Sequence, residues 1–205
     1  MNTVELIGYY GGDRAHALAA WTSTSRDLPS EKRGRIPALL KMLAEAGHHT
    51  PFERSTLHFL VRVETATHIQ MLKHRIGVSI NGESARYKEL KTPTFHVPED
   101  WTARQRIRLM KHNAASLKLY QRTLKELTPL IGRQRAKESS RFFLPYSNEL
   151  TLDVSFNWRS FAHFYGLRAS DHAQREISNV AVAMLNLVRG IKGSPFKHTI
   201  AAFGY

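Results

Sequence analysis

Apolar and polar residues alternate over residues 57–63 and 150–156, a period of two that is typical of half-buried β-strands. Residues 3–10 predict a further short strand, which Gly11 and Gly12 close. Glycines at 77 and 82 interrupt the segment 76–87, which predicts a loop that leads into an extended stretch from Ser84 to Leu90.

Apolar residues recur at helical spacing in most of the remaining chain. The predicted helices cover residues 35–46, 65–73, 103–127, 133–140, 158–167 and 172–190, with a last short one after Pro195. Thr102 is placed to cap the long helix, and Pro129 is expected to follow its end. No internal repeat or linker interrupts these elements. The pattern therefore predicts one α+β domain over residues 1–205.

The long helix at 103–127 carries an apolar stripe on one side and cations on its others. The expected stripe consists of Ile107, Met110, Ala114, Leu117, Leu124 and Leu127. The cations are Arg104, Arg106, Arg108, Lys111, Lys118, Arg122 and Lys125. Their simplest interpretation is a solvated helix surface.

Composition narrows the classes of protein. Among 205 residues there is no Cys, which excludes disulfides, thiolate zinc sites and a cysteine nucleophile. No apolar run is long enough for a membrane span, and the first residues carry no secretory signal, so we expect a cytoplasmic protein without a membrane partner. The 30 Lys and Arg outnumber the 17 Asp and Glu, a net charge of +13 that favours anionic partners such as nucleic acid or phosphorylated small molecules.

Chemically useful side chains gather in a few segments. Lys73-His74-Arg75 precedes a glycine-containing loop that continues to Ser84-Ala85-Arg86-Tyr87. Arg, Lys and close backbone approach at Gly suit a phosphate, whereas the plainer interpretation is a solvated basic turn. Adjacent histidines such as His48-His49 point apart in regular structure and rarely chelate one ion, so no metal site is predicted. The Phe and Tyr residues over 142–165 are interpreted as core.

Taken in order, these segments resemble the flavin-dependent thymidylate synthase family. The family signature is Arg-His-Arg, seven residues and Ser; here it is Lys73-His74-Arg75, eight residues and Ser84. Further segments similar to the family's are Gly47-His48-His49-Thr50-Pro51-Phe52-Glu53, Gln70, Arg141-x-x-Leu144-Pro145, Asn157-x-Arg159-Ser160 and Leu167-Arg168-x-x-x-His172-Ala173-Gln174-x-Glu176-Ile177.

Three positions depart from the family pattern. Lys73 replaces an arginine, which keeps the charge but loses the planar two-donor fork. Because the loop carries one extra residue, Gly82 stands where the family has a glutamate, and Glu83 follows one position later. His163 occupies a position that is often Asn in the family.

The resemblance implies reductive methylation of dUMP to dTMP, with 5,10-methylenetetrahydrofolate as carbon donor, NADPH as reductant and FAD as bound cofactor. It implies an antiparallel sheet flanked by helices and a homotetramer whose active sites lie between subunits. The flavin positions it implies are Thr50, Glu53, Lys73, His74, Arg75, Asn81, Asn157, Arg159, His163 and His172. The dUMP positions it implies are Gln70, Lys73, Glu83, Ser84, Arg86, Arg141 and Arg168.

Arg168 corresponds to the family's activating residue, and a guanidinium beside the uracil N3/O2 edge would stabilise charge on the ring. No His-Asp pair is placed by the sequence to activate Ser84, which is assigned to binding. The absence of Cys agrees independently with the flavin route, because the unrelated thymidylate synthases use a cysteine nucleophile. Nucleic acid is not expected as a partner on this interpretation. The alternative is a catalytically inactive, basic nucleic-acid-binding protein on the same fold.

Overall fold

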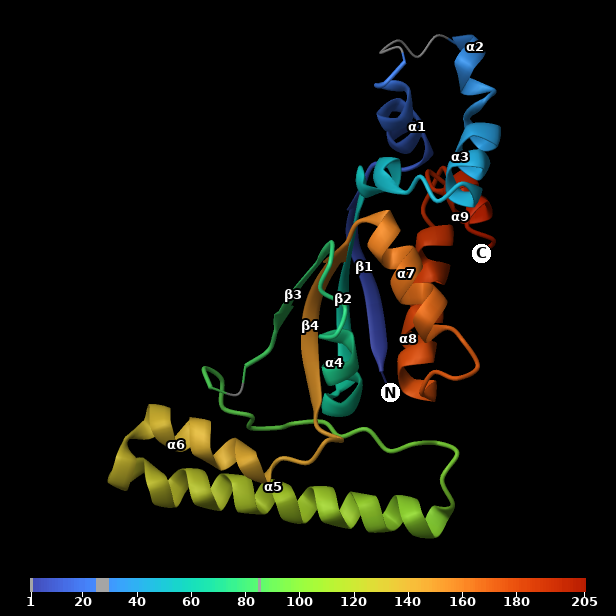
Figure 1. Ribbon diagram of the computed structural model, residues 1–205. Coiled ribbons are helices and arrows are strands. Elements are labelled where there is room, and N and C mark those ends of the chain that lie inside the picture. Colours follow the sequence, from blue (N-terminus) through green and yellow to red (C-terminus); the bar gives the residue numbers. More distant parts are fainter. Residues whose placement is uncertain (1, 25–29, 85) are drawn as a thin grey trace. The chain divides into compact units, whose positions relative to one another are not determined.

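The computed structural model describes residues 2–24, 30–84 and 86–205 (Figure 1). Ala85 of the Ser84–Tyr87 motif lies outside the described residues. The chain divides into two compact units, and each is described by itself. The first unit comprises Met1–Thr3, Arg62–Met71 and Asn81–Leu152, and the second comprises Val4–Val61, Leu72–Ile80 and Asp153–Tyr205. The prediction of a single domain stays a prediction.

Four strands form one antiparallel sheet in the order β1-β2-β4-β3. Their bounds are Thr3–Tyr10 for β1, Thr56–Glu64 for β2, Val78–Gly82 for β3 and Glu149–Phe156 for β4. β1, β2 and β4 confirm the predicted strands, whereas the loop expected over 76–87 is wrong because it contains β3. β3 has only five residues and stands at the end of the strand order, so pairing with β4, a contact distant in sequence, is what makes it a strand.

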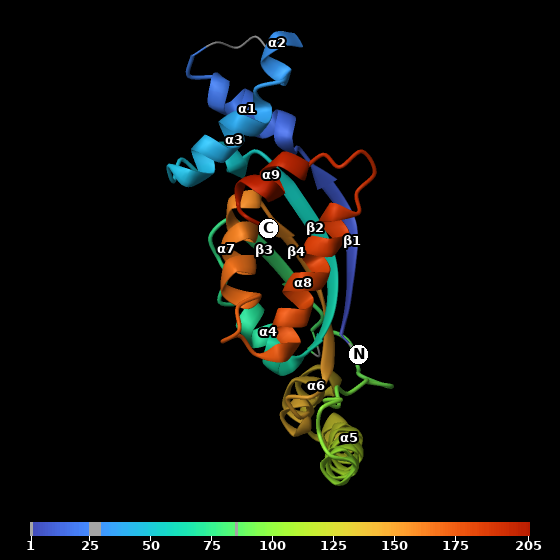
Figure 2. The ribbon, with the colours of Figure 1, turned by 90° about the vertical axis from the view of Figure 1, so that its right-hand side faces the viewer.

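In the second unit, α7 and α8 lie against one face of the sheet (Figure 2). The helices of this unit are α1 Asp13–Trp21, α2 Ser30–Arg33, α3 Ile36–Glu45, α7 Trp158–Arg168, α8 Arg175–Arg189 and α9 Lys197–Ala202, with a 3₁₀ turn at Thr50–Glu53. Its core is aromatic: Trp158 and Phe196 are fully buried and stacked, with ring centroids 5.6 Å apart. The predicted helices α3, α7, α8 and α9 are confirmed; α1 and α2 were not expected, since neither shows a clear apolar period.

In the first unit, α5 and α6 pack side by side as a helical hairpin (Figures 1 and 2). The helices are α4 Thr65–Met71, α5 Ala103–Ile131 and α6 Arg133–Ser140, followed by a 3₁₀ turn at Arg141–Phe143. Tyr120, Leu124 and Ala136 form their common core with Leu90, and the Leu90 amide donates to the Tyr120 hydroxyl at 3.1 Å. Among the described residues, no helix has both the length and the apolar character needed to cross a membrane.

Two boundaries in the first unit differ from expectation. α5 continues past Pro129 to Ile131, because a proline so close to the helix end disrupts little. The extended stretch expected from Ser84 to Leu90 is wrong. The chain turns there instead, and the amides of Tyr87 and Lys88 both donate to the Ser84 carbonyl at 3.2 and 3.1 Å.

The apolar stripe expected on α5 is only partly correct. Ile107 and Met110 are more than half exposed, whereas Asn113 is buried. The Asn113 side-chain oxygen accepts a hydrogen bond from the Ser147 hydroxyl at 2.8 Å, so a polar side chain is buried with one of its polar atoms paired. The buried face therefore runs through Asn113, Ser116, Tyr120 and Leu124.

Candidate functional site

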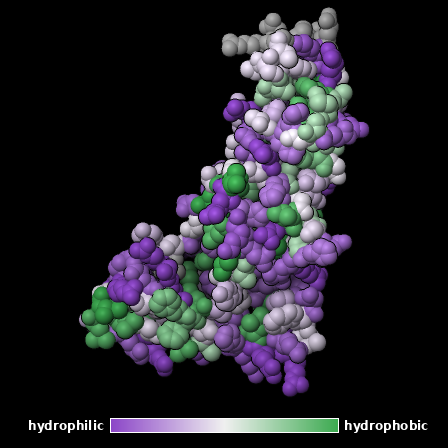
Figure 3. Space-filling view, viewed as in Figure 1, coloured by the Kyte–Doolittle hydropathy of each residue, from purple (hydrophilic) through white to green (hydrophobic). Residues whose placement is uncertain are grey.

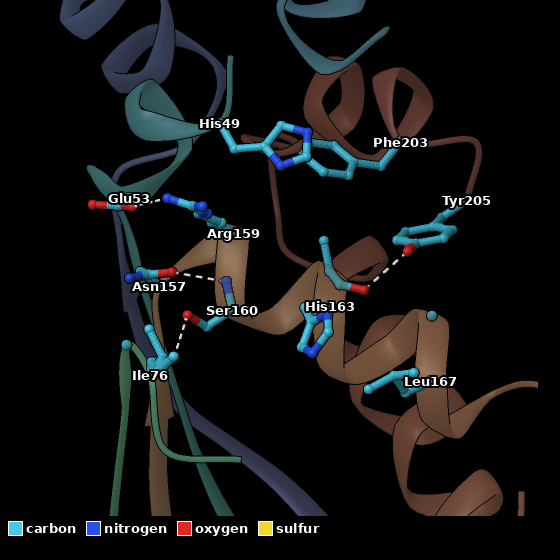
Figure 4. A pocket seen from close by; sticks show the side chains of 13 residues that line it. His49, Glu53, Ile76, Asn157, Arg159, Ser160, His163, Leu167, Phe203 and Tyr205 are labelled. Atoms are coloured by element: carbon cyan, nitrogen blue, oxygen red, sulfur yellow. Dashed lines mark hydrogen bonds and ion pairs between the residues drawn. The ribbon is translucent and has the colours of Figure 1, made fainter. Parts of the chain in front are cut away.

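A cavity of about 660 Å³ lies along α7, within the second unit (Figure 4). Its volume falls within the range of small-molecule sites. It is lined by His49, Glu53, Ile76, Gly77, Asn157, Arg159, Ser160, Ala162, His163, Gly166, Leu167, Phe203 and Tyr205. Four of the expected flavin positions, Glu53, Asn157, Arg159 and His163, therefore meet in one cavity.

The start of α7 forms one wall and holds the signature segment beside it. Asn157 caps the helix, since its side-chain oxygen accepts from the Ser160 amide at 2.8 Å. The Ser160 hydroxyl in turn donates to the Ile76 carbonyl at 2.7 Å. Gly77, at φ +65°, passes so close that an added Cβ would lie 2.2 Å from the Ser160 hydroxyl oxygen. The chain just after Lys73-His74-Arg75 is thus fixed to the first turn of α7.

The rest of the lining combines charge with aromatic rings, as the labelled side chains of Figure 4 show. Arg159 donates to Glu53 at 2.7 Å, and both side chains remain partly exposed. The rings of His49 and Phe203 lie with centroids 5.3 Å apart, and the Tyr205 hydroxyl donates to the Ala162 carbonyl at 2.9 Å. A helix N-terminus with an arginine suits an anion, and the rings suit a planar group.

The signature histidine is hydrogen-bonded to the expected activating arginine. The Arg168 Nε–H donates to His74 Nε2 at 2.9 Å, and the His74 ring meets the edge of Phe164 with centroids 5.0 Å apart. Burial, with a smaller contribution from the charges of Arg168 and His163, lowers the pKa of His74 to about 4. Because Nε2 accepts, neutral His74 carries its proton on Nδ1. Lys73 and Arg75, its neighbours, are exposed.

The remaining expected flavin residues do not line this cavity. Thr50, Lys73, His74, Arg75 and His172 belong to the same unit, whereas Asn81 belongs to the first unit.

In the first unit, the loop after β3 is held by ion pairs. Glu83 accepts from the Lys88 ammonium at 2.7 Å and from the Thr151 amide at 3.3 Å. Burial acts to raise the pKa of Glu83, but the hydrogen bonds from Lys88 and Thr151 outweigh it, so its pKa lies below the ordinary value. Arg86 holds one carboxylate oxygen of Glu138 with two donors, at 3.1 and 3.0 Å, and this pairing lowers the pKa of Glu138.

The expected dUMP positions are divided between the two units. Gln70, Glu83, Ser84, Arg86 and Arg141 belong to the first, and Lys73 and Arg168 to the second. A polar cavity of about 650 Å³ in the first unit is lined by only one of them, Glu83, together with side chains that include Arg62, Lys88, Arg133, Lys137 and Glu149. Arg141, at the start of its 3₁₀ turn, is exposed.

Several lining residues were missed from the sequence. Ser160 belongs to the segment Asn157-x-Arg159-Ser160 that the resemblance singled out, and Gly77 follows the signature segment closely, so these segments could have pointed to both. Phe203 and Tyr205 follow a short C-terminal helix without any motif, and only the folded chain brings them to the cavity. Glu138, the partner of Arg86, lies 52 residues away in sequence and carries no local signal.

The fold and this cavity define an α+β protein with a site suited to a ligand that combines an anionic group with a planar one. Residues 5–192 match the family described as thymidylate synthase complementing protein. The chain therefore belongs to this family, the flavin-dependent thymidylate synthases, as the resemblance implied.

Similar proteins carry the same assignment. The flavin-dependent thymidylate synthase of Pseudothermotoga lettingae is 32% identical over 193 residues, covering 92% of this chain and 85% of that protein. That of Geobacter sulfurreducens is 30% identical over 195 residues, covering 90% and 81%. Among solved structures, PolB of Streptomyces cacaoi, a UMP/dUMP methylase bound with 5-Br dUMP, superimposes with a TM-score of 0.83 at 28% identity over 100% of this chain and 95% of that chain.

Proposed function

We propose that the chain is a flavin-dependent thymidylate synthase that methylates dUMP. The carbon of 5,10-methylenetetrahydrofolate replaces the hydrogen at uracil C5, and two electrons from NADPH reduce it to a methyl group, leaving dTMP, tetrahydrofolate and NADP⁺. The observation that supports this most directly is the 2.9 Å hydrogen bond between Arg168 and the signature residue His74, within the unit that carries the cavity.

The cavity beside α7 fits the flavin. Arg159 and the capped start of α7 offer positive charge for the diphosphate, and the rings of His49 and Phe203 offer an apolar wall for a planar ring. When bound, FAD would carry electrons from NADPH toward the transferred carbon. We assign flavin contacts to Glu53, Asn157, Arg159 and His163, together with Thr50, Lys73, His74, Arg75, Asn81 and His172.

We assign dUMP to Gln70, Lys73, Glu83, Ser84, Arg86, Arg141 and Arg168. Arg86 and Arg141 suit the phosphate, because guanidinium groups bind phosphate through paired donors. Arg86 already holds the Glu138 carboxylate with two donors, so a nucleotide phosphate would displace Glu138 or share Arg86 with it. Arg168, whose orientation the His74 ring fixes, would stabilise negative charge on the uracil ring.

Assembly as a cytoplasmic homotetramer with active sites between subunits is part of this proposal. Exposed apolar side chains adjoin the proposed binding residues. Ile76 next to Arg75 is 92% exposed, and Phe142 next to Arg141 is 78% exposed. Such side chains gain most when another protein surface covers them.

The test is turnover by the purified chain with FAD, NADPH and 5,10-methylenetetrahydrofolate, measured as tritium release from 5-³H-dUMP and from 5-³H-UMP. We expect a flavin spectrum and release from dUMP. Tritium release from UMP alone would mean that the substrate is UMP and not dUMP, while the proposed methylation at C5 would stand. A colourless protein without release from either nucleotide would overturn the proposal and favour the inactive nucleic-acid-binding alternative.

A further inference from the structure

Six cations form a single row along the outward face of α5. They recur three, four or seven residues apart, which keeps them on one side of the helix. The row consists of Arg104, Arg108, Lys111, Lys118, Arg122 and Lys125, and all six side chains are exposed. At the helical rise the row spans roughly 32 Å. It lies opposite the buried face that contains Ser116 and Tyr120, and hydrophilic surface covers much of the lower edge of Figure 3, where α5 lies.

The row is unusual because almost nothing neutralises it. Residues 103–138 contain ten Lys and Arg but only two acidic residues, Glu126 and Glu138, so the α5–α6 hairpin supplies eight of the chain's thirteen surplus positive charges. Within the described parts of the chain, Arg122 alone among the six has a carboxylate partner, Glu126 at 3.7 Å.

Several exposed cations elsewhere do have a carboxylate partner. Arg86 is paired with Glu138, Lys88 with Glu83, and Arg159 with Glu53. Like charges three and four residues apart on a helix repel one another, so an unpaired row destabilises α5 unless an anion lies along it. A solvated surface would serve equally well with mixed charges. The single sign of the row therefore indicates a polyanionic partner.

The shape of the row selects among polyanions. It is long, straight and one residue wide, which suits a linear chain of phosphates. The face carries no Phe, Tyr or Trp on which unpaired bases could stack, as single-strand-binding surfaces require. The apolar face of α5 already packs in the hairpin core around Tyr120 and Leu124, so it is not free to enter a membrane.

We propose that the cation row on α5 binds the phosphate backbone of duplex nucleic acid without sequence preference. None of the six residues is among those assigned to flavin or dUMP, so this surface adds a binding function beyond the proposed methylation and does not depend on it. The proposal also differs from the inactive alternative, because the same chain would bind the duplex and remain an enzyme.

The experiment measures binding of the full-length protein to labelled 20-base-pair DNA and RNA duplexes by fluorescence anisotropy at several salt concentrations. With about six phosphate contacts, log K should fall against log salt with a slope of about −5, a loss of roughly 10³-fold between 50 and 200 mM. The triple variant Arg104→Gln/Arg108→Gln/Lys118→Gln should reduce the slope by about 3. Glutamine keeps good helix propensity, and thermal unfolding checks the fold.

The matched control removes the same charge elsewhere, through Arg189→Gln/Lys192→Gln/Lys197→Gln, all exposed in the second unit. The control should keep the wild-type slope. Equal weakening in both triple variants would show that net charge, not the row, binds the duplex, and would overturn the proposal. So would tighter binding to a single strand, binding to anionic vesicles but not to a duplex, or a changed oligomeric state in the row variant alone.

Discussion

At the scale of single residues, the hydrogen bond between Arg168 and His74 makes the orientation of the Arg168 guanidinium depend on the protonation state of the His74 ring. The Arg168 Nε–H can donate only while His74 Nε2 is unprotonated, and burial followed by the charges of Arg168 and His163 keeps the pKa of that ring at about 4. Neutral His74 therefore orients the guanidinium over the whole physiological pH range.

We expect Arg168→Ala to lower tritium release from 5-³H-dUMP by roughly 10²-fold, the scale for removing one charge-stabilising donor. Flavin binding should persist, because Arg168 does not line the cavity beside α7. Arg168→Lys should recover little, since an ammonium lacks the planar fork. In the protein without ligands, Arg168→Ala should also raise the pKa of His74, followed by NMR titration of its ring.

The control for this prediction is Arg189→Ala, an exposed arginine at the end of α8. It should leave release and the His74 titration unchanged. Near-normal release from Arg168→Ala would remove this residue from the activating role. An unchanged His74 pKa in that variant would show that the contact with Arg168 does not lower the pKa of His74.

Among single residues, the sequence predicted the neighbours of those that belong to a family motif. Glu53, Asn157, Arg159 and His163 were expected at one flavin site, and the cavity collects all four. Expected roles for these residues stay predictions. The contact between Arg86 and Glu138 could not be foreseen, because Glu138 lies on α6, 52 residues further along the chain, and any of several cations would fit it equally well by sequence.

At the scale of elements, Gly77 is the point at which the chain after the signature segment packs against the start of α7. We expect Gly77→Ala to displace the Asn157 cap, since its Cβ would lie 2.2 Å from the Ser160 hydroxyl oxygen at a φ of +65°. The free energy of unfolding should fall by about 1–3 kcal/mol, and flavin affinity should fall with it. Urea unfolding and flavin titration measure the two effects.

Gly34→Ala is the matched control, because no atom lies within 4 Å of its added Cβ and its φ is not in the left-handed region. It should be neutral or slightly stabilising. If Gly77→Ala were equally neutral, the contact between Gly77 and the first turn of α7 would have to leave more room for a side chain than the distances indicate.

Elements with a strong period were predictable, and those made by distant contacts were not. α3 was placed within one residue at each end, and β1 at its observed bounds. α6 was also placed at its observed bounds, 133–140, although Ala136 is its single apolar residue. β3 was missed because Gly77 precedes it and Gly82 ends it, which indicated a loop, and because its partner β4 is distant in sequence. The buried face of α5 was misplaced because Asn113 is buried through a hydrogen bond to Ser147, while Ile107 is left exposed.

At the scale of the whole molecule, one buried histidine ties together the two ends of the chain. His16 on α1 is fully buried, and its Nδ1 lies 2.9 Å from the Thr199 hydroxyl oxygen on α9. That hydroxyl donates to Asp13 at 2.6 Å, so it must accept from the His16 Nδ1–H. His16 Nε2 is buried without a hydrogen-bond partner among the described residues, and burial lowers the pKa of the ring to about 4.

This arrangement predicts that the chain loses stability on mild acidification. Between pH 6.5 and about 4 the unfolded chain binds a proton at His16 that the folded chain does not, so the free energy of unfolding falls as the pH falls, by ~3 kcal/mol at pH 4. Urea unfolding at pH 7, 5.5 and 4.5 measures the loss. His16→Asn keeps a donor near the Nδ1 position and removes the His16 titration. It should cost stability at pH 7 and reduce the acid slope, of which the lowered pKa of His74 maintains a part. His112→Asn, exposed on α5, should keep the wild-type slope. If His16→Asn also kept the full wild-type slope, groups other than His16 would cause the loss of stability in acid.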